Sequence, residues 1–144
     1  IQLEGIITPT AEWLYKIAKG ESIKIKTKKG FQIGAVLMIP PFFSGKDDME
    51  VVNTYRNLSI NFDKNDLTGI HIGDVKKDKN GILRVAGVSG WVLVVTASGT
   101  TVESARNSIY KNIKKITLIN MFYRTDIGIK WKSDSLKLKK WNYI

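Results

Sequence analysis

The chain has 144 residues, no cysteine and a formal net charge of +10 at neutral pH. Its length fits one domain, and 43% apolar with 25% charged residues is the composition of an ordinary globular protein. The absence of cysteine excludes disulfides and cysteine-ligated zinc sites. A transmembrane helix needs about 18 or more consecutive apolar residues, and the sequence has no such run. The positive charge favours polyanions, but lysine greatly outnumbers arginine, the better phosphate ligand, so we interpret the charge chiefly as compositional bias.

The N-terminal third predicts one helix and two strands. Thr8 and Pro9 predict a helix start, with Thr8 as the cap, and Gly20 predicts its end. Alternating residues over 23–27 predict a half-buried strand, and the apolar run 31–39 predicts a central one. The chain lacks an initial Met, which leaves a piece of a longer protein and a processed chain as equal alternatives.

The middle of the chain predicts a loop followed by strands. Two prolines and a glycine place a loop over 40–48, where Phe42 and Phe43 are either anchored in the core or exposed at a site. An Asn-Gly pair predicts a hairpin turn at 79–81. Strands are predicted over 57–62, 67–75, 82–86 and 91–96, the last as a second central strand.

The strongest helix signal lies near the C-terminus. Thr100 and Glu103 match a capping box, and apolar residues then recur every three or four positions, which predicts a helix over Thr101–Lys115. Residues 121–128 are strand-like or loop, and the tail 132–144 is a last strand or a frayed end. Together these elements predict an α+β fold, or a mainly antiparallel β-sandwich or barrel, with two helices on one side of the sheet.

Most catalytic signatures are absent. No glycine-rich phosphate loop and no nucleophile elbow occurs, and a catalytic triad would depend on the only histidine, His71. A lone histidine is more often a hydrogen-bonded structural residue. Asp47, Asp48 and Glu50 form a small acidic group, which is more often a solvated face than a metal site. The sequence therefore argues against a self-sufficient hydrolase or metalloenzyme.

Two motifs resemble a known family. Residues 91–97 read Trp-Val-Leu-Val-Val-Thr-Ala and residues 122–128 read Phe-Tyr-Arg-Thr-Asp-Ile-Gly, with the predicted helix between them. This order over Val88–Gly128 resembles the C-terminal domain of phosphoribosylamine–glycine ligases, of the ATP-grasp superfamily. The segment 69–73 around His71 resembles the family's His-Ala-Gly-Thr more weakly.

The sequence departs from the family at two places. The family's Tyr-Pro-Gly loop is replaced by Pro40–Gly45, and the arginine of its Gly-Gly-Arg is Trp91 here. If that arginine contacts a phosphorylated substrate, the alternatives are that this protein has a different substrate or that its parent is a diverged amine–carboxylate ligase. We interpret Trp91 as a core residue in preference to a stacking surface.

The resemblance implies an accessory role in purine biosynthesis. Residues 1–21 would be the terminal helix of the preceding ATP-grasp region, and residues 22–144 the C-terminal ligase domain. ATP and Mg would be bound by the parent protein and no cofactor by this chain, which would be inactive alone. The implied partners are the N-terminal and ATP-grasp domains and a small phosphorylated or amino-acid substrate, in the cytoplasm and without a membrane.

The same resemblance points to substrate-binding residues. Arg124 and Asp126 are two residues apart, so in an extended segment their side chains point to one side. They either pair only with each other or line a site, where Asp126 would orient Arg124 toward a phosphate or carboxylate. We expect Arg124 at a cleft edge near His71.

Two other hypotheses remain. Phe42, Phe43, Tyr55 and Trp91 could stack bases on a basic nucleic-acid-binding or phosphate-binding β-module, although core filling is the simpler account. Such a module would gather lysines and aromatics on one sheet face, whereas we expect only weak, non-specific binding of nucleic acid. The third hypothesis is a stand-alone protein-interaction domain.

Overall fold

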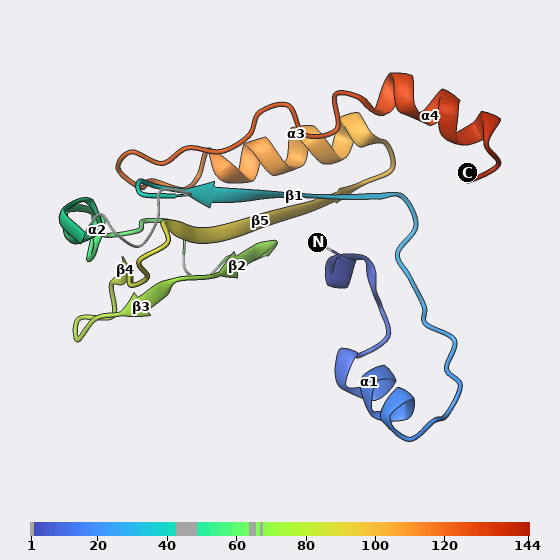
Figure 1. Cartoon of the computed structure of the whole chain (residues 1–144), viewed down its shortest axis with the longest axis horizontal. Helices are drawn as coiled ribbons and strands as arrows, with labels where there is room; N and C mark the ends of the chain where they lie inside the picture. The colour runs from blue at the N-terminus through green and yellow to red at the C-terminus, as the bar shows by residue number, and fades with distance from the viewer. Residues whose placement is uncertain (1, 43–48, 64–65, 67) are drawn as a thin grey trace.

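The computed structural model describes residues 2–42, 49–63, 66 and 68–144, and its centre is an antiparallel sheet (Figure 1). Strands β1 (Phe31–Met38), β5 (Trp91–Gly99) and β2 (Ile70–Ile72) lie in the order β1-β5-β2. A separate hairpin is formed by β3 (Val75–Lys77) and β4 (Leu83–Val85). The predicted α+β class and both predicted central strands are confirmed.

One face of the sheet is covered by α3 (Val102–Ile113). Alternate residues of the paired strands β1 and β5 are buried there with the apolar stripe of the helix. Among the described residues this core includes Ile33, Ala35, Leu37, Leu93, Val95, Ala97, Ala105, Ile109 and Ile113. The period of two in the strands and of about 3.6 in the helix is what brings these residues to one interface.

The opposite face of the sheet carries the remaining alternate residues. Val36 pairs with Val94, which in turn pairs with His71, and Gly34 pairs with Thr96. Directly opposite residues of antiparallel strands project to the same side, so these five positions share one face. We call this the open face, because α3 packs on the other one.

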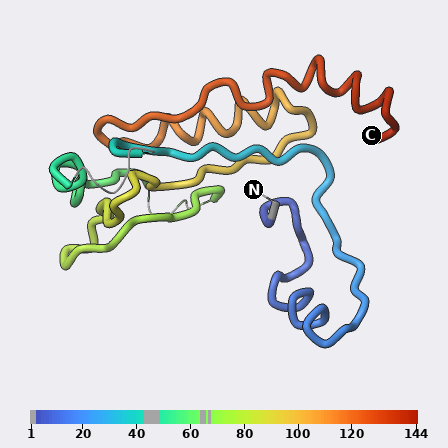
Figure 2. Tube along the Cα trace, in the orientation of Figure 1, coloured from blue at the N-terminus to red at the C-terminus, as the bar shows by residue number. Residues whose placement is uncertain are grey.

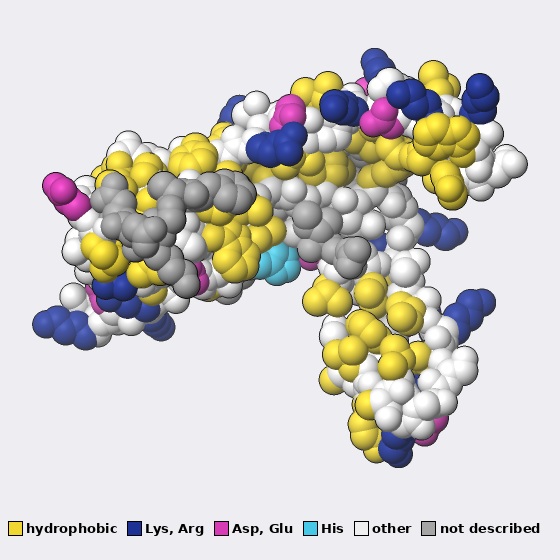
Figure 3. Space-filling view, in the orientation of Figure 1, with side chains coloured by type: hydrophobic (Ala, Val, Ile, Leu, Met, Phe, Trp, Pro, Cys, Tyr) yellow, Lys and Arg dark blue, Asp and Glu magenta, His cyan; other side chains and the backbone are white. Residues whose placement is uncertain are grey.

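The N-terminal residues form an arm that projects from the sheet. The 3-10 helix η1 (Gln2–Gly5) lies beside the start of β1, and α1 (Thr10–Ala18) lies at the far end of the arm (Figures 1 and 2). None of the nine residues of α1, all of which the structure describes, is buried. In Figure 3 hydrophobic side chains gather on this arm, away from the sheet.

Two predictions for the arm were wrong. Pro9, not Thr8, is the N-cap of α1, and the Thr8 hydroxyl accepts a hydrogen bond from the Lys26 amide instead. The alternating segment 23–27 forms no strand among the described residues and makes only an isolated bridge between Ile6 and Thr27. Alternation alone does not make a strand where no neighbouring strand edge is within reach.

Three further predicted segments differ in the structure. The tail forms the helix α4 (Trp131–Lys140) instead of a strand or frayed end, and Met49–Tyr55, for which no element was predicted, form the helix α2. The start of α4 is held by Trp131, whose ring lies edge-on to Phe31 with centroids 5.0 Å apart. The predicted strand 57–62 makes only isolated bridges, and the described part of 67–75 forms β2 and the start of β3.

The capping box of α3 lies one residue later than predicted. The hydroxyl of Thr101 accepts from the Ser104 amide at 3.0 Å, and the Ser104 hydroxyl accepts from the Thr101 amide at 3.1 Å. Thr100 and Glu103 were therefore the wrong pair, because serine at the third helical position performs the role expected of glutamate. In the described parts of the chain, no helix is both long and apolar enough to cross a bilayer.

Candidate functional site

An apolar groove of about 670 Å³ lies on the open face beside β1. Its floor is Gly34, Val36 and Met38, which alternate along β1 and therefore point to the open face. The rest of the lining comes from Phe42, Phe122, Tyr123, Arg124 and Ile127. In Figure 3 the only histidine, in cyan, borders hydrophobic side chains on the surface of this face.

The predicted residue Arg124 lies at the edge of this groove and is paired with Asp126. Its Nε donates to Asp126 Oδ1 at 2.9 Å and its Nη2 donates to Oδ2 at 2.6 Å. The hydrogen bonds from Arg124 lower the pKa of the Asp126 carboxyl, and Asp126 in turn raises the pKa of the guanidinium. Both side chains are exposed, 73% for Arg124 and 54% for Asp126, so the ion pair is open to a ligand.

The segment that carries this pair is fixed at three points. Phe122 exchanges two backbone hydrogen bonds with Met38, on the side of β1 away from β5. The Tyr110 hydroxyl donates to the Arg124 carbonyl at 3.0 Å, and Arg106 donates to the carbonyls of residues 125 and 127. Strand β1 and helix α3 thus hold the backbone of this segment, and Met121, Tyr123 and Ile127 pack against the core.

The predicted residue His71 is held at the other edge of the sheet. His71 lies on β2. Its Nε2 is 3.0 Å from the Thr96 hydroxyl and 3.7 Å from a carboxylate oxygen of Glu4. Lys28 Nζ donates to the other oxygen of Glu4 at 2.9 Å. The hydrogen bond from Lys28 lowers the pKa of the Glu4 carboxyl, and the Thr96 hydroxyl and His71 lower it further. Partial burial of Glu4 acts in the opposite direction but has the smaller effect.

Arg124 and His71 therefore belong to two separate polar groups. Strands β1 and β5 lie between them, so their backbones are about three strand spacings, roughly 14 Å, apart. Because Val36 and Val94 lie in the same cross-strand row as His71, an apolar strip separates the two groups on one face. A ligand or a protein surface that covers this strip can contact both.

The other predicted candidates have different environments. Trp91 is 41% exposed, so its interpretation as a core residue was wrong. Phe42 lies edge-on to Phe122 with ring centroids 6.3 Å apart, and Tyr55 packs against the core and accepts from Asn120. Phe43 and two acidic residues, Asp47 and Asp48, lie outside the described residues, and Glu50 is exposed on α2.

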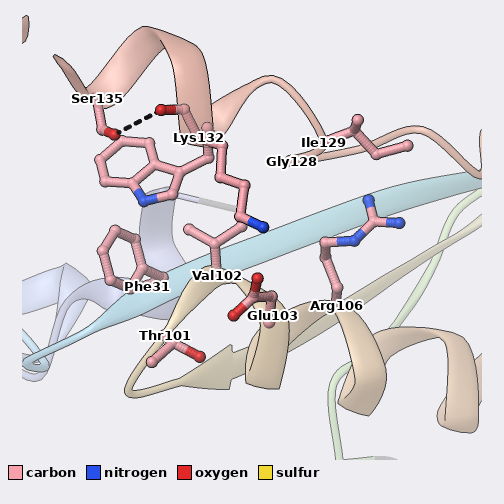
Figure 4. A pocket seen from close by; sticks show the side chains of 10 residues that line it. Phe31, Thr101, Val102, Glu103, Arg106, Gly128, Ile129, Lys132 and Ser135 are labelled. Carbon is pink, nitrogen blue, oxygen red and sulfur yellow. Dashed lines mark hydrogen bonds between the residues drawn. The ribbon is translucent and has the colours of Figure 1, made fainter.

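A second cavity, of about 500 Å³, lies where the start of α3 meets α4 (Figure 4). Arg106, Glu103 and Lys132 extend into it from these two helices. The Arg106 guanidinium already binds the backbone of the 121–128 segment, and no predicted site residue lines this cavity. Over the described part of the chain, no group of three or more His, Cys, Asp or Glu could hold a metal ion.

Two polar residues of the site had no sequence signal. Glu4 precedes Thr96 by 92 positions, and no pattern in the chain connects them. Thr96 occurs in the family-like strand motif, but only pairing with β2 places its hydroxyl beside His71. A buried threonine in an apolar strand, 1% exposed here, is the one feature that could have suggested a polar partner.

A three-stranded antiparallel sheet with one face under a helix and a groove on the other defines an α+β domain. The family model described as phosphoribosylglycinamide synthetase, C domain, matches residues 49–130, more than half of the chain, and the chain belongs to this family. The predicted resemblance is thereby confirmed. No curated protein matches the chain.

The fold resembles that of a solved ligase. The crystal structure of phosphoribosylamine–glycine ligase from Thermotoga maritima matches with a TM-score of 0.63 and 22% sequence identity. The match covers 83% of this chain and 28% of that chain. At this identity the likeness establishes the fold, and the chain spans only 28% of the length of that ligase.

Proposed function

We propose that this chain is the accessory C-terminal domain of an ATP-dependent carboxylate–amine ligase of purine biosynthesis and helps to close its active site. Family membership supports the assignment. The observation that carries it is the Arg124–Asp126 pair, displayed at the rim of the open-face groove on the family-like segment 122–128.

In this proposal Arg124 binds a phosphate or carboxylate of the substrate. A guanidinium held in a bidentate pair keeps a fixed plane, and its exposed fraction leaves donors for a second anion. His71, at the other edge of the apolar strip, would contact the same substrate or the surface that closes over it. The substrate class is a small phosphorylated or amino-acid molecule.

The remaining ligase domains are the proposed partners of the arm. Leu14 and Ile17, which lie on one apolar face of α1, are 49% and 55% exposed. Burying such a face stabilises a contact by about 25 cal/mol per Å². We place the domain boundary after residue 21, with residues 1–21 in the ATP-grasp region and 22–144 in the accessory domain.

ATP and Mg would be bound by the partner domains, in the cytoplasm, and the isolated chain would not turn over ATP. A triphosphate with magnesium is held by several phosphate and carboxylate contacts. Among the described residues, no group of three or more His, Cys, Asp or Glu could hold a metal ion.

The test is a comparison of three proteins: the full-length parent, the parent without residues 22–144, and the isolated chain. We expect amine-dependent and carboxylate-dependent ADP release from the full-length parent alone. A parent that keeps full turnover without residues 22–144 contradicts the proposal, as does ATP turnover by the isolated chain.

The nucleic-acid alternative is tested with the isolated chain and a single-stranded oligonucleotide. Attraction between the positive charge of the chain and the phosphates alone gives weak binding, with an affinity that falls steeply as the salt concentration rises. A tight complex with base preference that survives high salt would favour the nucleic-acid-binding module over the ligase domain.

A further inference from the structure

A chain of polar contacts joins the arm to the sheet through Glu4. One carboxylate oxygen of Glu4 accepts from Lys28 at 2.9 Å. The other lies 3.3 Å from the hydroxyl of Thr96, which is itself 3.0 Å from Nε2 of His71. Glu4 and Lys28 belong to the arm, whereas Thr96 and His71 belong to the strands β5 and β2.

We propose that Glu4 is a positioning residue, which fixes the angle of the arm on the sheet and holds His71 in the Nε2–H tautomer. The imidazole Nδ1 is then left as a hydrogen-bond acceptor for a ligand amine or hydroxyl. The inference deepens the proposed function, since His71 is one of its ligand-binding residues, but the tests below do not depend on activity.

The direction of the hydrogen bonds follows from the donors available. The Thr96 hydroxyl is buried and has one proton, and both of its other neighbours, Glu4 Oε2 and the Gly69 carbonyl, only accept. The hydroxyl therefore donates to one of these oxygens and accepts from His71, whose Nε2 must carry a proton. The Glu4 carboxylate, 3.7 Å from Nε2, favours that proton further.

The free nitrogen of His71 is accessible. The His71 side chain is 52% exposed, and within the described residues only Nε2 of the ring has a hydrogen-bonding neighbour. A neutral imidazole with its proton on Nε2 has a lone pair on Nδ1. A ligand ammonium or hydroxyl group fits this nitrogen, whereas a phosphate oxygen does not.

The same contacts account for the attachment of the arm. The Lys28 amide donates to the Gly5 carbonyl and the Ile7 amide donates to the Lys26 carbonyl, both at 2.8 Å, so residues 4–7 and 26–28 form one unit. Glu4 connects this unit to β5 and β2, while Gly5 lies against the Gln32 side chain of β1. Removing the carboxylate leaves the arm on the sheet with a looser orientation.

The tautomer is tested by ¹⁵N NMR of the isolated chain, at a pH where imidazole is neutral. We expect a resolved Nε2–H proton resonance for His71, and its loss through faster exchange with water in Glu4→Ala and Thr96→Val. Thr96→Ser keeps the hydroxyl and should keep the resonance. Glu12→Gln removes an exposed ion pair within α1 and should also keep it.

The arm is tested by distances between spin labels. The chain has no cysteine, so Glu21→Cys on the arm and Lys111→Cys on α3 can be labelled selectively. We expect a narrow distance distribution, which broadens with Glu4→Ala and not with Glu12→Gln, while circular dichroism shows both variants folded. An Nε2–H resonance and a distance distribution that are both unchanged in Glu4→Ala would overturn the inference, as would a proton on Nδ1 in the unsubstituted chain.

Discussion

Arg124 donates to both carboxylate oxygens of Asp126, which follows it by only two residues, with N–O distances of 2.9 and 2.6 Å. An exposed ion pair contributes only about 0–1 kcal/mol to folding, because water and salt screen it. The pair therefore adds little to the stability of the fold. In the proposed function it orients the guanidinium of Arg124 for an anionic ligand.

The first prediction separates binding from stability at Arg124. In the full-length parent, Arg124→Ala should lower turnover roughly 10- to 100-fold, because a hydrogen bond to a charged group contributes about 1.5–3 kcal/mol. The free energy of unfolding should change by less than about 1 kcal/mol. Steady-state kinetics and urea unfolding measure the two effects.

The matched control is a second close arginine–carboxylate pair among the described residues. Arg84 Nε donates to Asp78 at 2.6 Å and its Nη1 donates to the Asn57 carbonyl at 3.0 Å, in the hairpin and away from the groove. Arg84→Ala should destabilise the domain and leave turnover per folded molecule unchanged. Equal losses of turnover and stability in Arg124→Ala would leave that residue with a structural role only.

A second prediction concerns the start of α3. Thr101→Ala should lower the free energy of unfolding by about 1 kcal/mol, because the hydroxyl caps the helix through the Ser104 amide. Thr100→Ala should have almost no effect, since the structure assigns no cap to Thr100. Urea unfolding of the two variants tests the assignment, and a larger loss for Thr100→Ala would refute it.

The sequence predicted the parts of the fold in which local pattern and burial agree. The strands 31–38 and 91–99 and the helix 102–113 form one core, and their apolar periods are continuous. The tail was mispredicted because Leu136 and Leu138 alternate, whereas its conformation is set by helix-forming lysines and by the contact of Trp131 with Phe31.

The candidate site was only partly accessible from the sequence. Arg124 and Asp126 are near neighbours in the chain, so their pairing followed from spacing alone. Glu4, Thr96 and His71 meet only after β2 pairs with β5 and the arm folds back, and no local rule anticipates contacts over such separations. The expected closeness of Arg124 to His71 depended on strand order, which the sequence does not specify.

A third prediction concerns Trp91, the position where the family pattern has arginine. Because the indole is 41% exposed, Trp91→Arg should change the free energy of unfolding by less than about 1 kcal/mol. Leu93→Ala, two residues along the same strand and fully buried, should cost about 2–5 kcal/mol. Urea unfolding compares the two, and a loss in Trp91→Arg as large as that in Leu93→Ala would restore the core interpretation.

The last prediction concerns the pH dependence of the contact between the arm and the sheet. Lys28, Thr96 and His71 lower the pKa of the Glu4 carboxyl below its ordinary value of 4.5. The folded chain therefore binds fewer protons at Glu4 than the unfolded chain does, and the carboxylate contributes stability above the ordinary pKa. That contribution should be lost as the pH falls through the lower, folded-state value.

The pKa values of the hydrogen-bonded carboxyls of Asp66, Asp78 and Asp126 are also lowered, so these groups contribute to the pH dependence as well. Because both proteins contain them, the difference in stability between the unsubstituted chain and Glu4→Gln isolates the effect of Glu4. Urea unfolding should show the unsubstituted chain to be the more stable near neutral pH, with a difference that shrinks toward zero well below about pH 4. A difference that stays constant across this range would mean that the Glu4 side chain acts through packing and that its charge is not what stabilises the arm.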